Sequence, residues 1–311
     1  MNTPPKEKIA VLLMAHGGPD SLDDVEPFLR HIMKERPPSP EVIALVKERY
    51  RLIGGKSPLL EITRRQAEAL EAELNKKSAL FRVYVGMRHW NPSIKDVVKR
   101  ILDDGASRLI AISLAPQYSK LSVGAYIQTL KSALADAGSD LETTAVESWH
   151  DQPLLLDAFA KKVKEGLAGY PEDVRPSVQV LFTAHSLPER ALAEGDPYSK
   201  ELEGTVAGIV NRLGDIRWRF AYQSRGMSPG KWLGPEVDDV LNEMAARGER
   251  RLLIAPIGFV CDHVEILYDI DILYKQNAEA KGVELRRTES LNASPLFIQA
   301  LAAVVHTHLP T

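Results

Sequence analysis

The sequence predicts an α/β protein with two Rossmann-like domains, each a parallel sheet flanked by helices. Short apolar runs alternate with amphipathic helical segments along the chain, which is the pattern of repeated βαβ units. The apolar run at residues 180–184 leads directly into His185, and a near copy at residues 11–15 leads into His16. Because each half starts on the same strand-and-histidine pattern, we expect an internal pseudo-repeat to relate the two domains.

The expected strands fall in matching positions in the two halves. The first half has four, at residues 8–15, 81–87, 108–115 and 142–148. The third is almost continuously apolar, as in strands that helices cover on both faces. The second half repeats the first three at residues 180–184, 219–225 and 248–256. We therefore place an N-terminal domain at residues 1–150 and a C-terminal domain at residues 151–294, and a final helix in residues 295–311 is a candidate to pack back on the first domain.

Charge, cysteine content and hydropathy narrow the class of protein. With 39 Lys and Arg against 42 Asp and Glu, the chain offers no basic footprint for nucleic acid. Its single cysteine, Cys261, rules out an internal disulfide and a cysteine-ligated iron–sulfur cluster. The sequence shows no signal core and no apolar run of bilayer length, so we expect a cytoplasmic monomer without a transmembrane segment.

Residues Gly55, Lys56 and Ser57 look like the end of a phosphate-binding loop, but the rest of that motif is missing. The motif requires a glycine five residues before its Gly-Lys pair, and Tyr50 occupies that position. No Gly-x-Gly-x-x-Gly follows any expected strand either. The sequence therefore argues against a nucleotide-binding enzyme.

His185 lies at the carboxyl end of its expected strand. In open parallel sheets, ligands bind in the crevice beyond this edge. Ser186 and Glu189 have the spacing of a capping box, which predicts that a helix starts immediately after the strand. A lone histidine at a strand end is more often structural than catalytic, but His16 in the other half and the carboxylates described next favour a chemical role.

Three carboxylates follow the strand that ends near Pro256. If a helix begins near Asp262, then Asp262, Glu265 and Asp269 fall on one helical stripe. Such a stripe is either a solvated face or a group held together by a cation or basic side chains. A histidine with a carboxylate at one cleft edge is a borderline ligand set for a divalent transition metal and too small for a closed structural site. The pattern suits an enzyme that holds a metal briefly and passes it on.

Seven short motifs occur in an order that matches one known family. They are IGGKSPL at 53–59, GMRHWNP at 86–92, APQYS at 115–119, AHSLPE at 184–189, YQS at 222–224, PGKWLGP at 229–235 and GFVCDHVE at 258–265. From about Ile9 to the C-terminus, the chain closely resembles the ferrochelatases, which insert ferrous iron into a porphyrin. It is most similar to the soluble, cluster-free enzymes of Gram-positive bacteria that use coproporphyrin III. The resemblance implies that porphyrin and ferrous iron are substrates, with no cofactor.

The resemblance also implies roles for individual residues. His185 and Glu265 match the catalytic pair that meets iron on one face of the macrocycle. His16 occupies the position of the axial contact on the opposite face, where coproporphyrin-type enzymes often carry a tyrosine. Asp269 continues an acidic path that leads to this pair. The residues that match positions holding the porphyrin, its propionates or the cleft edge are Arg49, Tyr50, Ser57, Tyr126, Arg88 and His89.

The chain departs from the family pattern at two positions. Met33 stands where a propionate-binding arginine is expected, which keeps protoporphyrin IX open beside coproporphyrin III as the substrate. Leu273 interrupts the acidic path. Two other functions also stay open: cobalt insertion into a sirohydrochlorin-type ring, and a porphyrin or haem carrier without catalytic activity.

Overall fold

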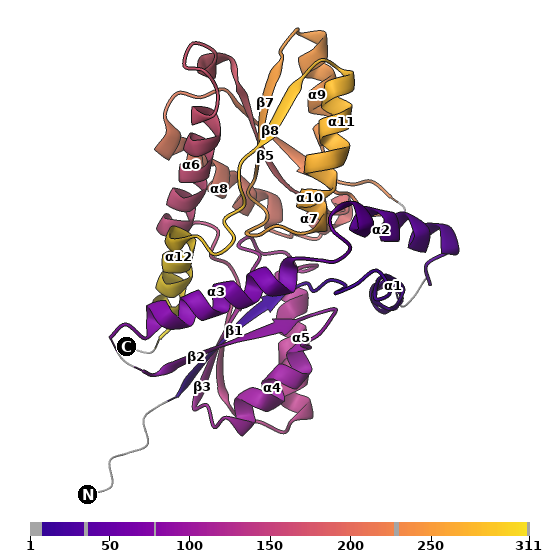
Figure 1. The fold of residues 1–311 in the computed structure, drawn as a ribbon. Coiled ribbons are helices and arrows are strands. Elements are labelled where there is room, and N and C mark those ends of the chain that lie inside the picture. The colour runs from indigo at the N-terminus through magenta and orange to yellow at the C-terminus, as the bar shows by residue number, and fades with distance from the viewer. Residues whose placement is uncertain (1–7, 34–36, 78, 227–229, 310–311) are drawn as a thin grey trace, which may run out of the picture. The chain divides into compact units, whose positions relative to one another are not determined.

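The computed structural model describes residues 8–33, 37–77, 79–226 and 230–309, and its chain forms two compact units (Figure 1). The first unit contains Met1–Ala115, Lys120–Trp149 and Asn292–Thr311, and the second contains Pro116–Ser119 and His150–Leu291. Within the described ranges, none of the helices has the length and apolar character needed to cross a bilayer.

A four-stranded parallel sheet forms the centre of the first unit. Its strands, in the spatial order β2-β1-β3-β4, are β1 (Ile9–Ala15), β2 (Phe81–Met87), β3 (Arg108–Ser113) and β4 (Glu142–Val146). Strand β1 pairs with β2 on one side and β3 on the other, and all seven of its residues are buried. The apolar run that predicted β1 is therefore the central strand of the sheet, covered on both faces.

The described residues of the first unit form six helices. They are α1 (Val25–Ile32), α2 (Pro40–Leu52), α3 (Leu59–Leu74), α4 (Ile94–Asp103), α5 (Val123–Asp136) and α12 (Pro295–Thr307). Ser39 begins α2, because its Oγ accepts a hydrogen bond from the Val42 amide at 3.4 Å and Pro40 suits the first helical position. The C-terminal helix α12 packs beside α3 (Figure 1), where Gln66 Nε2 donates to the Asn292 carbonyl at 2.9 Å.

The second unit repeats the sheet of the first. Its four parallel strands, in the order β6-β5-β7-β8, are β5 (Gln179–His185), β6 (Trp218–Gln223), β7 (Arg251–Pro256) and β8 (Glu284–Arg287). In each unit, the strand that comes first in the sequence lies between the second and the third. This shared order confirms the predicted pair of parallel α/β sheets and their pseudo-repeat.

Among its described residues, the second unit has eight helical segments. They are α6 (Pro153–Ala168), η1 (Arg175–Ser177), α7 (Glu189–Ala193), α8 (Tyr198–Leu213), α9 (Val237–Ala246), α10 (Val264–Leu267), η2 (Asp269–Tyr274) and α11 (Lys275–Ala280). The segment η2 is a π-helix. Such segments interrupt regular helical spacing and occur often at functional sites.

One predicted helix start is wrong, and a second differs in length. The Ser186–Glu189 capping box does not form: α7 begins after Pro188, and Ser186 Oγ donates to the Leu233 carbonyl at 2.9 Å. This partner is 47 positions away, so local spacing cannot reveal it. A helix does begin near Asp262, at Val264, but it is four residues long and gives way to a π-helix.

Candidate functional site

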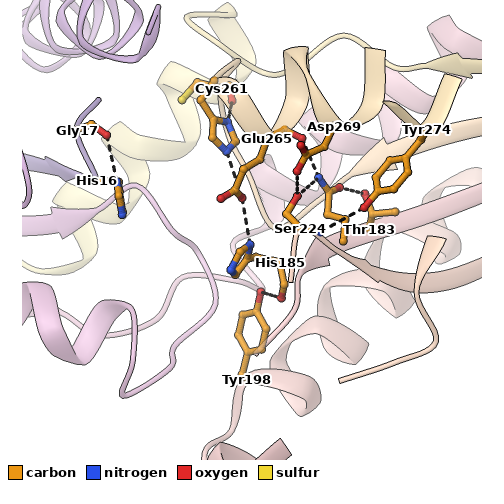
Figure 2. A network of polar contacts seen from close by, with 12 residues as sticks. His16, Gly17, Thr183, His185, Tyr198, Ser224, Cys261, Glu265, Asp269 and Tyr274 are labelled. Atoms are coloured by element: carbon orange, nitrogen blue, oxygen red, sulfur yellow. Dashed lines mark hydrogen bonds and ion pairs between the residues drawn. The ribbon is translucent and has the colours of Figure 1, made fainter. Parts of the chain in front are cut away.

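His185 and Glu265 form the central pair of the second unit. His185 ends β5, Glu265 lies on α10, and His185 Nδ1 is 3.1 Å from Glu265 Oε2 (Figure 2). Because a carboxylate only accepts hydrogen bonds, this contact requires the proton on Nδ1. A neutral His185 ring then keeps its Nε2 lone pair for a proton or a metal ion.

The pair stabilises its own charged forms. Burial lowers the pKa of His185, but the charge and hydrogen bond of Glu265 and the charge of Asp269 outweigh it and raise that pKa above the usual 6.5. Burial raises the pKa of Glu265, yet His185 and His263 hold it well below the usual 4.5. Glu265 is therefore an anion near neutral pH, suited to orient an imidazole or to contact a cation.

His263 lies on the other side of Glu265, and no role was expected for it from the sequence. Its Nδ1 donates to the Cys261 carbonyl at 3.1 Å, and its Nε2 is 3.7 Å from Glu265 Oε2. The ring of Phe259 stacks at a tilt on His263, with their centroids 4.6 Å apart. Glu265 is thus placed between two imidazoles, an arrangement that the motif at residues 258–265 contained but did not reveal.

The expected stripe of three carboxylates is wrong. Asp262 precedes α10, accepts a hydrogen bond from Ser290 Oγ at 2.7 Å and pairs with Arg287 at 3.3 Å. Asp269 is buried at the start of η2 and accepts a short hydrogen bond from Ser224 Oγ (Figure 2). Glu265 and Asp269 both raise the pKa of His185 through their charges. Asp262 instead holds the loop against the segment after β8.

In the first unit, His16 follows the central strand and lies beside the exit of β2. The His16 side chain is exposed, and its ring centroid is 4.7 Å from that of His89. The backbone ties the two segments together, because the Arg88 and His89 amides donate to the Ala15 and His16 carbonyls, each at 2.9 Å. The structure therefore brings the candidate residues His16, Arg88 and His89 to one strand edge.

Ser57 and Tyr50 lie next to the glycine turn that follows His16. A Cβ placed on Gly18 would lie 2.6 Å from Ser57 Oγ and 3.7 Å from the Tyr50 hydroxyl oxygen. Both side chains are buried, and the Ser57 amide donates to the Pro19 carbonyl at 2.8 Å. Glycine at position 18 thus lets Ser57 approach the turn that carries His16.

The remaining candidates are Arg49 and Tyr126. Arg49 is half-buried on the last turn of α2, next to Tyr50. Tyr126 is buried on α5, and the Arg88 guanidinium carbon lies 5.6 Å from the centre of its ring. Burial lowers the pKa of Arg88 from its usual 12.5, while Tyr126 opposes that shift.

His16 and these porphyrin-site candidates belong to the first unit, whereas His185, Glu265 and Asp269 belong to the second. In the part of the chain that the structure describes, no cluster of three or more His, Cys, Asp or Glu side chains is arranged to hold a metal ion.

Comparison with known proteins identifies the family. The profile of the ferrochelatase family matches residues 8–309. A ferrochelatase from Herpetosiphon aurantiacus is 45% identical over 299 residues, covering 96% of this chain and 98% of that protein. A coproporphyrin III ferrochelatase from Geobacillus kaustophilus is 41% identical over 303 residues, covering 96% of each chain. The chain therefore belongs to the ferrochelatase family, and its activity is metal insertion into a porphyrin in haem biosynthesis.

Solved structures of chelatases share the fold. SirB from Bacillus subtilis with Fe3+ superposes with a TM-score of 0.61 at 11% identity, covering 96% of this chain and 94% of that one. The cobalt complex of the sirohydrochlorin chelatase SirB from Bacillus subtilis subspecies spizizenii has a TM-score of 0.56 at the same identity and coverage. At this identity the likeness concerns the two-domain Rossmann-like architecture alone.

Proposed function

We propose that this protein inserts ferrous iron into coproporphyrin III and releases two protons. Protoporphyrin IX ranks second as a candidate substrate. The observation that carries the proposal is the His185–Glu265 pair, with Nδ1 and Oε2 3.1 Å apart at the carboxyl edge of a parallel sheet. Relatives named coproporphyrin III ferrochelatases, at 41% and 39% identity, support the choice of porphyrin. We expect no cofactor, because iron is itself a substrate, and no iron–sulfur cluster, because the chain has a single cysteine.

The chemistry needs a group that removes protons from the ring while iron enters. A porphyrin carries protons on two pyrrole nitrogens, and both protons must leave as the metal binds. A neutral imidazole accepts protons near pH 7. In our proposal His185 Nε2 first helps to position iron and then accepts the two pyrrole protons one after the other, each passing to solvent before the next. Glu265 orients the ring through Nδ1 and stabilises the imidazolium that forms at each step.

The other candidate residues have supporting roles in this proposal. His16 contacts the metal or the ring from the opposite face, and Asp269 leads protons or iron toward Glu265. A porphyrin is flat and stiff, so gripping it out of plane exposes its nitrogen lone pairs at the expense of binding energy elsewhere on the ring. The residues proposed to bind the macrocycle, its propionates and the cleft edge are His16, Arg49, Tyr50, Ser57, Tyr126, Arg88 and His89.

Anaerobic ferrous iron insertion, followed by absorbance with coproporphyrin III and protoporphyrin IX in parallel, tests the proposal. We expect turnover with both and a higher kcat/KM for coproporphyrin III. A higher kcat/KM for protoporphyrin IX would overturn the substrate assignment and make Met33 a determinant of specificity. Turnover with neither porphyrin, but cobalt insertion into sirohydrochlorin, would replace the proposal with the related chelatase activity. Tight porphyrin binding without any insertion would identify a carrier.

A further inference from the structure

Gln223 ends strand β6 beside His185. The two residues are register partners in the parallel pairing of β5 with β6. Gln223 is almost completely buried, with 1% of its surface exposed. A buried primary amide is costly unless its donors and acceptor are satisfied. Its hydrogen-bond partners therefore indicate what the residue does.

The side chain of Gln223 connects two segments that carry the candidate site. Its Oε1 accepts a hydrogen bond from Thr183 Oγ1 at 2.7 Å, and Thr183 lies two residues before His185 on β5. Its Nε2 donates to the backbone carbonyl of Glu265 at 3.0 Å and to Ser224 Oγ at 3.3 Å. The amide thus joins the strand of His185 to the backbone of Glu265.

The backbone of Gln223 holds the same strand end. Its carbonyl accepts a hydrogen bond from the Ser186 amide at 2.8 Å, directly after His185. Gln223 therefore contacts the His185 segment through both backbone and side chain, and the Glu265 segment through its side chain. The partners Thr183 and Glu265 lie 40 and 42 positions away in the sequence.

The segment that carries Glu265 has little regular structure to position it. Helix α10 is only four residues long and continues into the π-helix η2. The loop before it is anchored at its start, where the Ile257 and Gly258 amides donate to the Thr183 carbonyl. The bond from Gln223 to the Glu265 carbonyl is a second anchor, placed at the functional residue itself.

We infer that Gln223 is a positioning residue that sets the placement of Glu265 relative to His185. The inference rests on the proposed function of that pair in metal insertion. Residues that orient a metal-contacting group typically change metal affinity or activity by about 10–100-fold when they are replaced. A buried glutamine that only fills the core would change stability alone.

Gln223→Met tests the inference, because it keeps the length of the side chain and removes its polar atoms. We expect kcat/KM for ferrous iron to fall about 10–100-fold, while the porphyrin dissociation constant stays within about twofold of wild type. The matched control is Gln179→Met at the opposite end of β5, where Gln179 is buried and its Nε2 donates to the Val180 carbonyl at 3.0 Å. Equal kinetics in the two variants would overturn the inference.

Thr183→Val provides a milder test if Gln223→Met does not fold. It removes the hydroxyl that donates to Gln223 Oε1 and keeps the side-chain shape. We expect a smaller loss in the same kinetic constant, and unchanged kinetics would contradict the positioning role. In a Glu265→Ala background, Gln223→Met should cause no further loss, because the group that it positions is absent. A full additional loss would show that Gln223 acts by another route.

A spectroscopic readout separates failure of this inference from failure of the proposed function. In 15N-labelled protein, the Nδ1–H resonance of His185 reports the hydrogen bond to Glu265 without any substrate. We expect Gln223→Met to shift that resonance and Gln179→Met to leave it unchanged. If wild type inserted no iron but the resonance still shifted, the proposed function would fail and the positioning role would stand. An unshifted resonance in Gln223→Met would overturn the positioning role.

Discussion

His185 Nδ1 and Glu265 Oε2 lie 3.1 Å apart, although the two residues are 80 positions apart in the sequence. The contact joins the last residue of a buried strand to a four-residue helix. It fixes which nitrogen of His185 carries the proton and which is left for chemistry. The way in which activity and stability change with pH should therefore be different when Glu265 is replaced.

We predict that Glu265→Gln shifts the acid limb of the pH–rate profile to lower pH. Glu265 helps to raise the pKa of His185 above 6.5, so wild type gains activity as the pH rises through that raised value and the imidazole becomes neutral. Without the carboxylate charge, burial lowers the His185 pKa, and the imidazole becomes neutral at lower pH. The overall rate also falls because a metal contact is lost. An unchanged acid limb, measured with porphyrin at saturation, would remove His185 as the titrating base.

The same pair should make stability depend on pH. The raised pKa of His185 contributes stability that is complete below pH 6.5 and disappears as the pH rises through the raised value. The lowered pKa of Glu265 contributes stability that is complete above pH 4.5 and disappears as the pH falls through the lowered value. The difference in unfolding free energy between wild type and Glu265→Gln should therefore be largest between pH 4.5 and 6.5. Urea denaturation at several pH values measures it, and a pH-independent difference would contradict the pairing.

Gly18→Ala should weaken porphyrin binding. The new methyl group would lie 2.6 Å from Ser57 Oγ and 2.7 Å from Ser57 Cβ, so Ser57 or the His16 turn must move. Overpacking of this kind costs about 1–3 kcal/mol, which corresponds to about 5–150-fold weaker binding when the porphyrin-bound form bears the strain. Gly138→Ala is the control for a general loss of stability, since its positive φ strains an alanine while the new methyl has no atom within 4 Å. Fluorescence titration with porphyrin measures both, and equal affinities would show that Ser57 does not contribute.

Met33→Arg should favour coproporphyrin III. The additional guanidinium would supply a partner for a propionate that protoporphyrin IX lacks. An exposed ion pair of this kind contributes about 0.2–1 kcal/mol, so we expect kcat/KM for coproporphyrin III to rise up to about fivefold. Met33→Leu is the matched control. A rise of the same size with protoporphyrin IX would show that position 33 does not read the number of propionates.

Asn75→Ala should destabilise the edge of the first sheet. Asn75 follows α3, and its side chain bonds the Phe81 carbonyl at 2.8 Å and the Phe81 and Leu80 amides at 3.0 and 3.1 Å. Leaving these backbone groups without Asn75 costs about 1–3 kcal/mol. Urea denaturation measures the loss, with Gln128→Ala on the exposed face of α5 as the control. A difference between the two variants below about 0.5 kcal/mol would contradict this role.

Short apolar runs were sufficient to predict most of the strands of the two sheets. Strand β2 was predicted at residues 81–87 and occupies Phe81–Met87, because its aromatic and β-branched residues favour a strand. Strand β8 was missed. It is only four residues long, and two of its residues are exposed, so its pattern is too short to detect.

The site was less predictable because its geometry depends on contacts between distant residues. The rule that strand ends face one edge indicated where His185 would lie. The predicted stripe fails because Asp262 pairs with Arg287, which lies on the strand β8 that was not predicted, and because a π-helix breaks the regular spacing. Gln223 has no periodic signal of its own, and only its partners in the fold reveal its bonds to Thr183 and Glu265.

The most direct test of the account compares anaerobic ferrous iron insertion by wild type and His185→Ala, with porphyrin binding measured on the same samples. We predict that wild type turns over repeatedly and that His185→Ala loses about 10²–10⁴-fold in kcat, while its porphyrin dissociation constant stays within about twofold. Equal turnover in the two proteins would contradict the central claim that His185 accepts the pyrrole protons as iron enters the ring.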